Sequence, residues 1–203
     1  LFTWSDIMYV DEDEDPLVIE LYAYQFDWRA RYSGKDNTLG KANVRLIEGN
    51  NQLGVDTSDP NAQDDKVVNE LHLPLGRKVL FKMRSQDVLH SAYMPHFRAQ
   101  MNCVPGMITQ FAFTPSMTTD DMRMNDEVIE KVEYINQIRT EKNIELLAKG
   151  EEVLEMYEFD YLLLCNKICG ASHYNMQMKI VVDTEKDYNK WISSQDAFSS
   201  IMQ

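Results

Sequence analysis

Short runs of alternating apolar and polar residues dominate the chain and predict β-strands. The clearest run covers residues 17–32 (LVIELYAYQFDWRARY), which are rich in β-branched and aromatic side chains. Similar runs predict further strands at residues 67–75, 77–84, 107–114 and 179–182. Glycine, proline, asparagine and aspartate gather over residues 33–66, which favours turns with short strands between them. Many short strands separated by turns predict a mainly β fold, arranged as a β-sandwich.

The hydrophobic period changes between about residues 118 and 157. Val128, Val132 and Ile135 recur at helical spacing, with Glu and Lys between them, and Gly150 is a helix breaker. We therefore predict an amphipathic helix, or a helix pair, inserted into the β-rich chain. Thr184 and the three residues after it form a capped helix start, which predicts a C-terminal helix carrying Tyr188 and Trp191.

The predicted elements form one domain with a short segment on either side. Residues 1–16 end in an acidic run and are expected to be a juxtamembrane stub and linker. Residues 17–192 form the domain, and residues 193–203 a C-terminal tail. No stretch approaches the roughly 20 apolar residues that span a bilayer. Because the chain opens at Leu1 rather than Met, we expect a piece of a longer protein, with any membrane anchor absent from it.

The net charge of the chain limits which classes of partner are expected. The chain has 20 Lys and Arg against 33 Asp and Glu, a formal net charge of −13. Nucleic acid is therefore not expected as a partner, because phosphates require clustered Lys and Arg. The acidic surface suits a basic protein partner or serves solubility alone.

The chemistry is concentrated in residues 165–176, Cys-Asn-Lys-Ile-Cys-Gly-Ala-Ser-His-Tyr-Asn-Met. Two thiols (Cys165 and Cys169), an imidazole (His173) and a thioether (Met176) lie within this stretch. Soft sulfur ligands together with imidazole favour copper. A second imidazole, His90, lies 75 residues before Cys165, after a predicted strand, and a sandwich can bring it beside this loop. A pair of copper ions bridged by both cysteine sulfurs would then have one histidine each.

Other interpretations of the loop stay open from the residues alone. A zinc site could use both cysteines with His90 and His173, but zinc has no use for Met176. A mononuclear blue-copper site needs only one cysteine. Haem attachment and redox dithiols normally use Cys-x-x-Cys, which this spacing does not match. A purely structural role would have to account for five matching residues at once.

The motif resembles the CuA site of cytochrome c oxidase subunit II. The resemblance rests on Cys-x-x-x-Cys-Gly-x-x-His-x-x-Met at residues 165–176 and on Asp-Val-Leu-His-Ser at residues 87–91. Val104-Pro105-Gly106 and Gln25-Phe26-Asp27-Trp28 also match the family's pattern, and Tyr188 to Trp191 resembles its terminal helix. The resemblance implies a cupredoxin fold, a Greek-key β-sandwich.

The resemblance also implies a role for each ligand. Cys165 and Cys169 would bridge two copper ions, and His90 and His173 would each bind one of them. Met176 would be the weak axial ligand of one copper, and the backbone carbonyl of Lys167 that of the other. The domain would accept electrons from cytochrome c, or an equivalent donor, and pass them to haem in oxidase subunit I. It would lie at the periplasmic face of a bacterial inner membrane.

Several positions depart from the family's pattern. Lys167 stands where a glutamate usually helps to bind magnesium, and an ammonium cannot ligate a cation, so that neighbouring magnesium is in doubt. Phe26 replaces a tryptophan at which the electron arrives. Trp28 is expected on the same strand face, so either residue is a candidate for this role. The helical insertion is a further departure.

Two other functions remain as alternatives. The CuA domain of a nitrous oxide reductase shares the copper loop but needs a large second domain rich in histidines. A zinc-stabilised β-sandwich acting as a binding module is the other alternative. Cys103 is expected to be a buried apolar residue, and His72 and His96 to be ordinary histidines.

Overall fold

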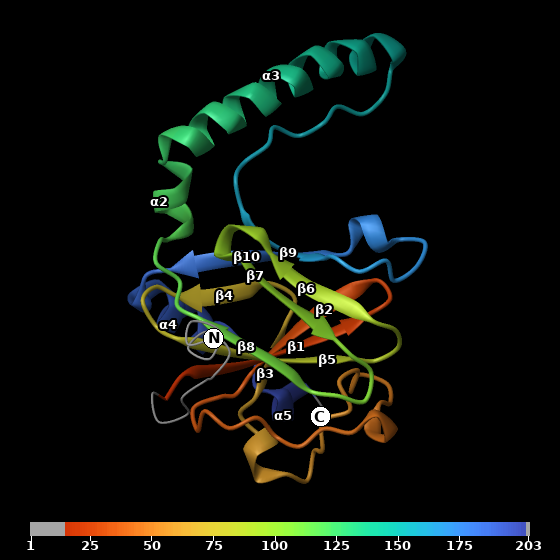
Figure 1. Ribbon diagram of the computed structural model, residues 1–203, viewed down its shortest axis with the longest axis vertical. Helices are drawn as coiled ribbons and strands as arrows, with labels where there is room; N and C mark the ends of the chain where they lie inside the picture. Colours follow the sequence, from red (N-terminus) through yellow and green to blue (C-terminus); the bar gives the residue numbers. More distant parts are fainter. Residues whose placement is uncertain (1–14, 202–203) are drawn as a thin grey trace, which may run out of the picture.

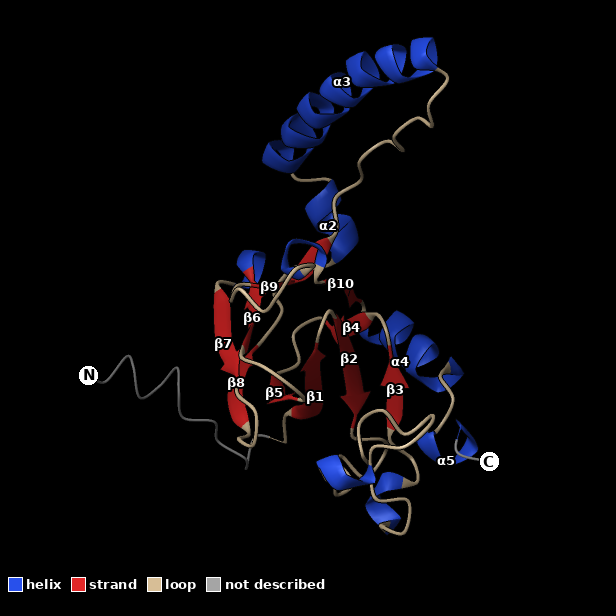
Figure 2. Ribbon diagram, turned by 90° about the vertical axis from the view of Figure 1, so that its right-hand side faces the viewer, coloured by secondary structure: helices blue, strands red, loops and turns tan. Residues whose placement is uncertain are grey.

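The computed structural model describes residues 15–201, in which ten strands form two five-stranded sheets (Figures 1 and 2). The first sheet has the order β3-β2-β1-β5-β8, formed by Lys66–Val68, Asp27–Tyr32, Leu17–Tyr24, Val79–Ser85 and Thr109–Phe113. The second has the order β4-β10-β9-β6-β7, formed by Leu71–Pro74, Gln177–Asp183, Tyr161–Cys165, His90–Met94 and Ala99–Cys103. The pairs β1·β5 and β4·β10 are parallel, and the other pairs are antiparallel. The predicted mainly β sandwich is confirmed.

The core lies between the sheets, because alternate residues of each strand point inward. Ile19, Leu21, Phe81 and Leu163 are fully buried members of one large cluster. That cluster continues to Cys165 at one end of the sandwich, so apolar packing reaches the candidate metal ligands directly.

Several predicted strands differ from the observed ones. Residues 17–32 form two strands of a hairpin, because the chain turns at Gln25–Phe26. Phe26 therefore lies in the turn, and the expectation that it shares a strand face with Trp28 is wrong. Residues 67–75 divide between β3 and β4, which belong to different sheets. His90 begins β6, a separate strand from β5. The edge strand β7 was not predicted.

The inserted segment forms a projecting arm, defined here as residues 119–160 (Figures 1 and 2). It contains α2 (Thr119–Arg123), α3 (Asp126–Lys149) and an extended return segment, residues 150–160. An amphipathic helix or a helix pair was predicted, and the break at Gly150 is confirmed: Gly150 caps α3 in the left-handed conformation, with φ of 70°. The predicted helical region reached about residue 157, whereas residues 151–157 lie in the return segment.

The predicted C-terminal helix is α4, Glu185–Ser194, whose N-cap is Thr184. Its Trp191 stacks on His72 of β4, with ring centroids 4.0 Å apart. The stretch from residue 193, expected to be a tail, contains a further short helix, α5 (Phe198–Ile201). Phe198 is buried with Tyr22, Leu53 and Val55 in a second apolar cluster. The stub at residues 1–14 lies outside the described residues.

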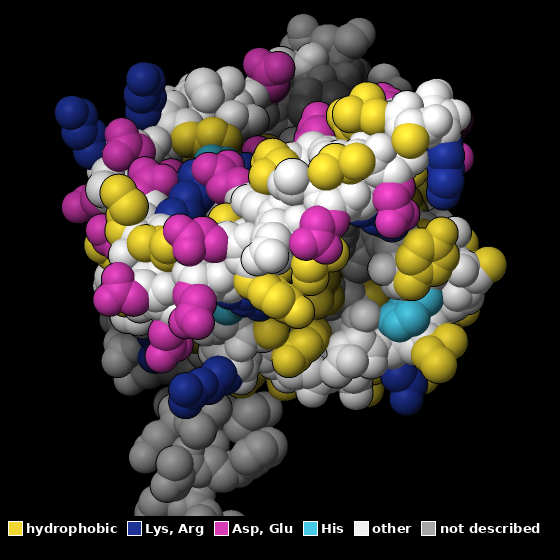
Figure 3. Space-filling view, turned by 90° about the horizontal axis from the view of Figure 1, so that it is seen from above, with side chains coloured by type: hydrophobic (Ala, Val, Ile, Leu, Met, Phe, Trp, Pro, Cys, Tyr) yellow, Lys and Arg dark blue, Asp and Glu magenta, His cyan; other side chains and the backbone are white. Residues whose placement is uncertain are grey.

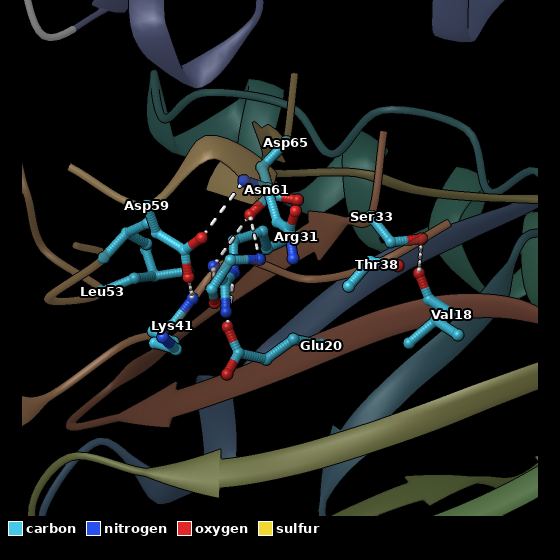
Figure 4. Close-up of polar contacts among 12 residues, drawn as sticks. Val18, Glu20, Arg31, Ser33, Thr38, Lys41, Leu53, Asp59, Asn61 and Asp65 are labelled. Carbon is cyan, nitrogen blue, oxygen red and sulfur yellow. Dashed lines mark hydrogen bonds and ion pairs between the residues drawn. The ribbon is translucent and has the colours of Figure 1, made fainter. Parts of the chain in front are cut away.

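A buried ionic cluster holds the long loop of residues 33–65 against the first sheet (Figure 4). Arg31 donates to Glu20 at 2.7 Å and to Asp65 at 2.9 Å, and also binds the carbonyl of Gly40 at 2.9 Å. Arg84 pairs with the other oxygen of Glu20. Burial raises the pKa of Asp65 to about 6 against the opposing charge of Arg31. Burial also acts to raise the pKa of Glu20, but Arg31 and Arg84 together hold it below its usual value.

Candidate metal centre

The two cysteines of the loop lie at one end of the second sheet. Cys165 ends β9, and Cys169 lies in the connection to β10. Both are buried free thiols, and their Sγ atoms are 3.8 Å apart. Burial, together with the neighbouring Cys165, raises the pKa of Cys169 to about 11. Two buried thiolates this close repel each other, so a bound cation would stabilise both.

Strand pairing brings His90 to the same point, although it lies 75 residues earlier in the chain. β6 pairs with β9 so that Ala92 is opposite Cys165, two residues from His90. The His90 side chain is fully buried, and its Nδ1 lies 3.8 Å from Sγ of Cys165. Among the described residues, His90, Cys165 and Cys169 form a group whose ligand atoms all lie within 4.8 Å of one another.

The remaining predicted ligands complete the cluster. Nδ1 of His173, in the short 3-10 helix η5 (His173–Asn175), lies 3.5 Å from Sγ of Cys169. Sδ of Met176 lies 3.8 Å from the same sulfur, and Met176 is buried. The carbonyl of Lys167 lies 3.3 Å from Sγ of Cys165, while the Lys167 residue itself is exposed. The structure thus brings together all six residues predicted from the sequence, and the thiol, imidazole and thioether donors suit copper.

Two polar residues that the sequence analysis did not single out support this cluster. Asp87 Oδ1 lies 2.8 Å from His90 Nε2, which leaves Nδ1 free to face the sulfurs. The other oxygen of Asp87 accepts the backbone N–H of Gln25 at 2.7 Å. The side chain of Gln25 in turn donates to the carbonyl of Cys169 at 2.5 Å. The β1–β2 turn therefore connects the His90 side of the cluster to the loop that carries Cys169.

The same turn packs directly on the cysteine loop. Gly170 has φ of 145°, a backbone region that side chains rarely adopt, and a Cβ there would lie 2.7 Å from the Phe26 ring. The Phe26 ring thus occupies the space over Gly170, beside Cys169. Only a glycine fits this close approach.

The two aromatic candidates for electron arrival occupy different places. Phe26 is partly exposed in the turn, whereas Trp28 is fully buried in the core. The Trp28 ring meets the His90 ring edge-on, with centroids 6.3 Å apart. Phe26 is therefore the one within reach of a surface partner, and Trp28 the one beside a candidate ligand.

The third cysteine and the remaining histidines lie outside the cluster. Cys103 is fully buried opposite His90 in the β6–β7 pair, and burial raises its pKa to about 12. His72 is held by Asp183, with 2.5 Å between Nδ1 and the carboxylate, and by stacking on Trp191. His96 meets the rings of Phe159 and Tyr161 edge-on. The expectation that Cys103 is buried is confirmed.

Sequence comparison decides the family. The sequence pattern of the periplasmic domain of cytochrome c oxidase subunit II matches residues 17–122, more than half of the chain. The chain belongs to the cytochrome c oxidase subunit II family. This membership implies a copper site and makes the chain a periplasmic domain.

Individual subunit II relatives agree with this assignment. The alternative cytochrome c oxidase subunit 2 of Bradyrhizobium diazoefficiens is 34% identical over 203 residues, covering 99% of this chain and 58% of its own. Cytochrome c oxidase subunit 2 of Alkalihalophilus pseudofirmus is 21% identical, covering 94% and 37%. This subunit II chain therefore spans roughly four to six tenths of the length of these curated relatives.

A solved subunit II structure has the same fold. The periplasmic domain of subunit II (CoxB) of Bradyrhizobium japonicum superposes with a TM-score of 0.51 at 15% identity, covering 91% of this chain and 95% of that one. The cupredoxin-like Greek-key fold expected from the sequence is thereby confirmed. Across the described residues, none of the helices has both the length and the apolar character needed to cross a membrane.

Proposed function

We propose that this domain holds a dinuclear CuA centre and relays electrons within a cytochrome c oxidase. The observation that carries the proposal is the meeting of six donors of the expected kinds at one end of the second sheet. Cys165 and Cys169 would bridge two copper ions, with His90 and His173 as one imidazole ligand each. Met176 and the carbonyl of Lys167 would be the weak axial ligands.

The centre, when loaded, supplies reversible one-electron transfer. The chain's own residues hold the ligands still, because His90 and Cys165 lie on paired strands and the cysteine loop is tied to the β1–β2 turn. The surrounding core excludes water from both sulfurs. A rigid and dry ligand set suits electron transfer, since little needs to move when the charge changes.

The positions around the cluster support a proposal for the path of the electron. We infer that cytochrome c, or an equivalent donor, delivers the electron near Phe26, and that haem in subunit I receives it for oxygen reduction. Phe26 lies partly exposed over Gly170, beside Cys169, and supports this choice. The domain would lie at the periplasmic face of the bacterial inner membrane, beside subunit I. The bond chemistry of oxygen would take place in that subunit.

Lys167 does not suit the magnesium site that the resemblance implies. Lys167 contributes only its carbonyl to the cluster, and its exposed ammonium group cannot ligate a cation. We therefore propose no magnesium ligand from this residue.

Copper loading of the purified domain tests the proposal. The loaded domain should be purple and give the EPR signal of an electron shared between two copper ions. Cys165→Ser and Cys169→Ser should each abolish that signal, because both sulfurs are needed as bridges. Cys103→Ser is the matched control, since this thiol is also buried but lies outside the cluster.

Two outcomes would contradict the proposal. A colourless protein that retains one zinc ion would favour the zinc-stabilised binding module instead. Loss of the shared-electron signal in a Cys103→Ser variant that unfolds at the wild-type temperature would show that the bridging thiols are wrongly assigned.

A further inference from the structure

The arm contributes little to the body of the domain that carries it. Of the 24 residues of α3, only Val128 is buried. At the base of the arm, Arg123 joins α2 to the return segment by binding the carbonyl of Phe159 and the carboxylate of Asp160, both at 2.9 Å. Beyond this base the helix projects away from both sheets (Figures 1 and 2). Packing of the domain core therefore does not explain why the helix is so long.

The return segment covers one face of α3 through three polar side chains. Asn136 exchanges two hydrogen bonds with the backbone of Tyr157, at 3.0 and 2.7 Å, and Asn143 does the same with Leu154, at 2.8 and 2.7 Å. Between them, Arg139 donates to the carbonyl of Glu155 at 2.5 Å. These contacts identify the covered face of the helix. The opposite face, half a turn away at 100° per residue, points away from the return segment.

The uncovered face has a distinct composition, and we call it the outer face. Its centre is Tyr134 and Ile138, which are 65% and 48% exposed. Four exposed glutamates lie at its two ends: Glu127, Glu130, Glu141 and Glu145. This helix face is about 27 Å long, since 18 residues rise about 1.5 Å each. The ion pairs of the described residues include none of these four glutamates.

Packing within the fold does not account for this composition. Glu141 and Glu145 are four residues apart, and like charges at this spacing repel. Because the side chains of Tyr134 and Ile138 are exposed, the fold gains little free energy from burying their apolar surface. An aromatic anchor inside a charged rim is, however, the usual composition of a protein-binding surface. Viewed from above, acidic and hydrophobic side chains lie close together on this side of the molecule (Figure 3).

We propose that the outer face of α3 is a docking surface for a protein partner that presents an apolar contact surrounded by Lys and Arg. Charge complementarity selects this occupant: the arm has 13 Asp and Glu against five Lys and Arg, which is −8 of the chain's −13. A second copy of this chain would place glutamates against glutamates. A basic partner would instead be attracted over a distance comparable to the Debye length.

The docking surface is separate from the candidate metal centre. The arm joins the second sheet at Tyr161, the first residue of β9, and at the other end of β9 lies Cys165. Thr119 also binds the backbone of Val182 near the end of β10, whereas Met176 precedes its start. The base of the arm is thus at the opposite end of the strands from the cysteine loop, and none of the outer-face residues belongs to the candidate metal centre. The inference therefore does not depend on copper binding.

Photo-crosslinking from the outer face tests this inference in the complete protein in its own membranes. The probe is p-benzoylphenylalanine in place of Tyr134, and the crosslinked peptide is identified by mass spectrometry. We expect a peptide from a different protein with an excess of Lys and Arg, and a yield that falls roughly tenfold as salt is raised, because the attraction is screened. A crosslink to a second copy of this chain, to lipid or to no protein would overturn the inference.

A pair of charge-matched variants sharpens the test. Glu141→Gln with Glu145→Gln removes two charges from the outer face, whereas Glu151→Gln with Glu152→Gln removes two from the exposed start of the return segment. Only the first pair should lower the crosslinking yield, by several fold. Equal yields from the two pairs would show that net charge alone attracts the partner, and the outer face would then not be the docking surface. Circular dichroism confirms that α3 remains helical in both.

Discussion

At the scale of single residues, the candidate metal ligands could be predicted from the sequence, but the residues that hydrogen-bond to them could not. Cys165, Cys169, His173 and Met176 belong to one short motif, so their spacing indicates a metal loop without any structure. Gln25 lies 62 residues from Asp87 and 144 from Cys169. Its local sequence does not indicate a hydrogen bond to either residue. Asp87 was detectable only as the residue three positions before His90. Hydrogen bonds between distant segments depend on the register of the sheets, which local patterns do not specify.

The bond between Asp87 and His90 leads to a prediction about metal affinity. Asp87→Ala should weaken copper binding by roughly 10–100-fold, because the imidazole loses the carboxylate that orients it. Competition with a chelator of known affinity measures this loss. Asp27→Ala, which removes a carboxylate from the neighbouring β1–β2 hairpin that has no bond to His90, is the control. Equal affinities of the two variants would show that the strand alone orients His90.

At the scale of elements, the predictions failed where strands are short and divided by turns. Residues 17–32 and 67–75 were each predicted as one continuous run, yet each contains a turn that no glycine or proline marks. β7 was missed because its sequence, AQMNC, is polar at the exposed positions of an edge strand. The helices were found more readily, since a helical period sustained over 24 residues and capping residues such as Thr184 and Gly150 leave a clear pattern. The side chains that fasten the return segment had no such pattern.

The two asparagines of α3 give a prediction at this scale. Their seven-residue separation spans about 10.5 Å along a helix, which equals the rise of about three extended residues, the separation of Leu154 and Tyr157. Asn136→Ala with Asn143→Ala should therefore release the return segment. Hydrogen exchange at the amides of Leu154 and Tyr157 should become roughly tenfold faster, given about 1 kcal/mol for each net hydrogen bond. Gln137→Ala, on the exposed side of α3, should leave both rates unchanged.

At the scale of the whole molecule, the buried ionic cluster links stability to pH. The folded-state pKa of Asp65 is about 6, above the ordinary value of 3.8, so Asp65 stabilises the fold most when it is protonated. Its contribution is complete below about pH 3.8 and is lost as the pH rises through about 6. Glu20, whose pKa is lowered, acts in the opposite direction and loses its contribution as the pH falls.

Asp65→Asn isolates the first effect. The free energy of unfolding of the wild type, relative to that of Asp65→Asn, should decrease by up to about 3 kcal/mol between pH 4 and pH 7. Urea unfolding at several pH values measures this difference. A difference that grows with pH would mean that the ion pair with Arg31 outweighs the burial of Asp65.

The arm also bears on the entropy of the chain. The connection between β8 and β9 is 47 residues long. Closing a flexible loop of that length rather than one of six residues costs only about 2 kcal/mol, since the penalty grows with the logarithm of length. The contact between Arg123 and Asp160, near the two ends of this connection, offsets part of this penalty. The connection can therefore gain or lose whole helical turns with little effect on folding. Its length can thus match the size of the protein that binds the arm.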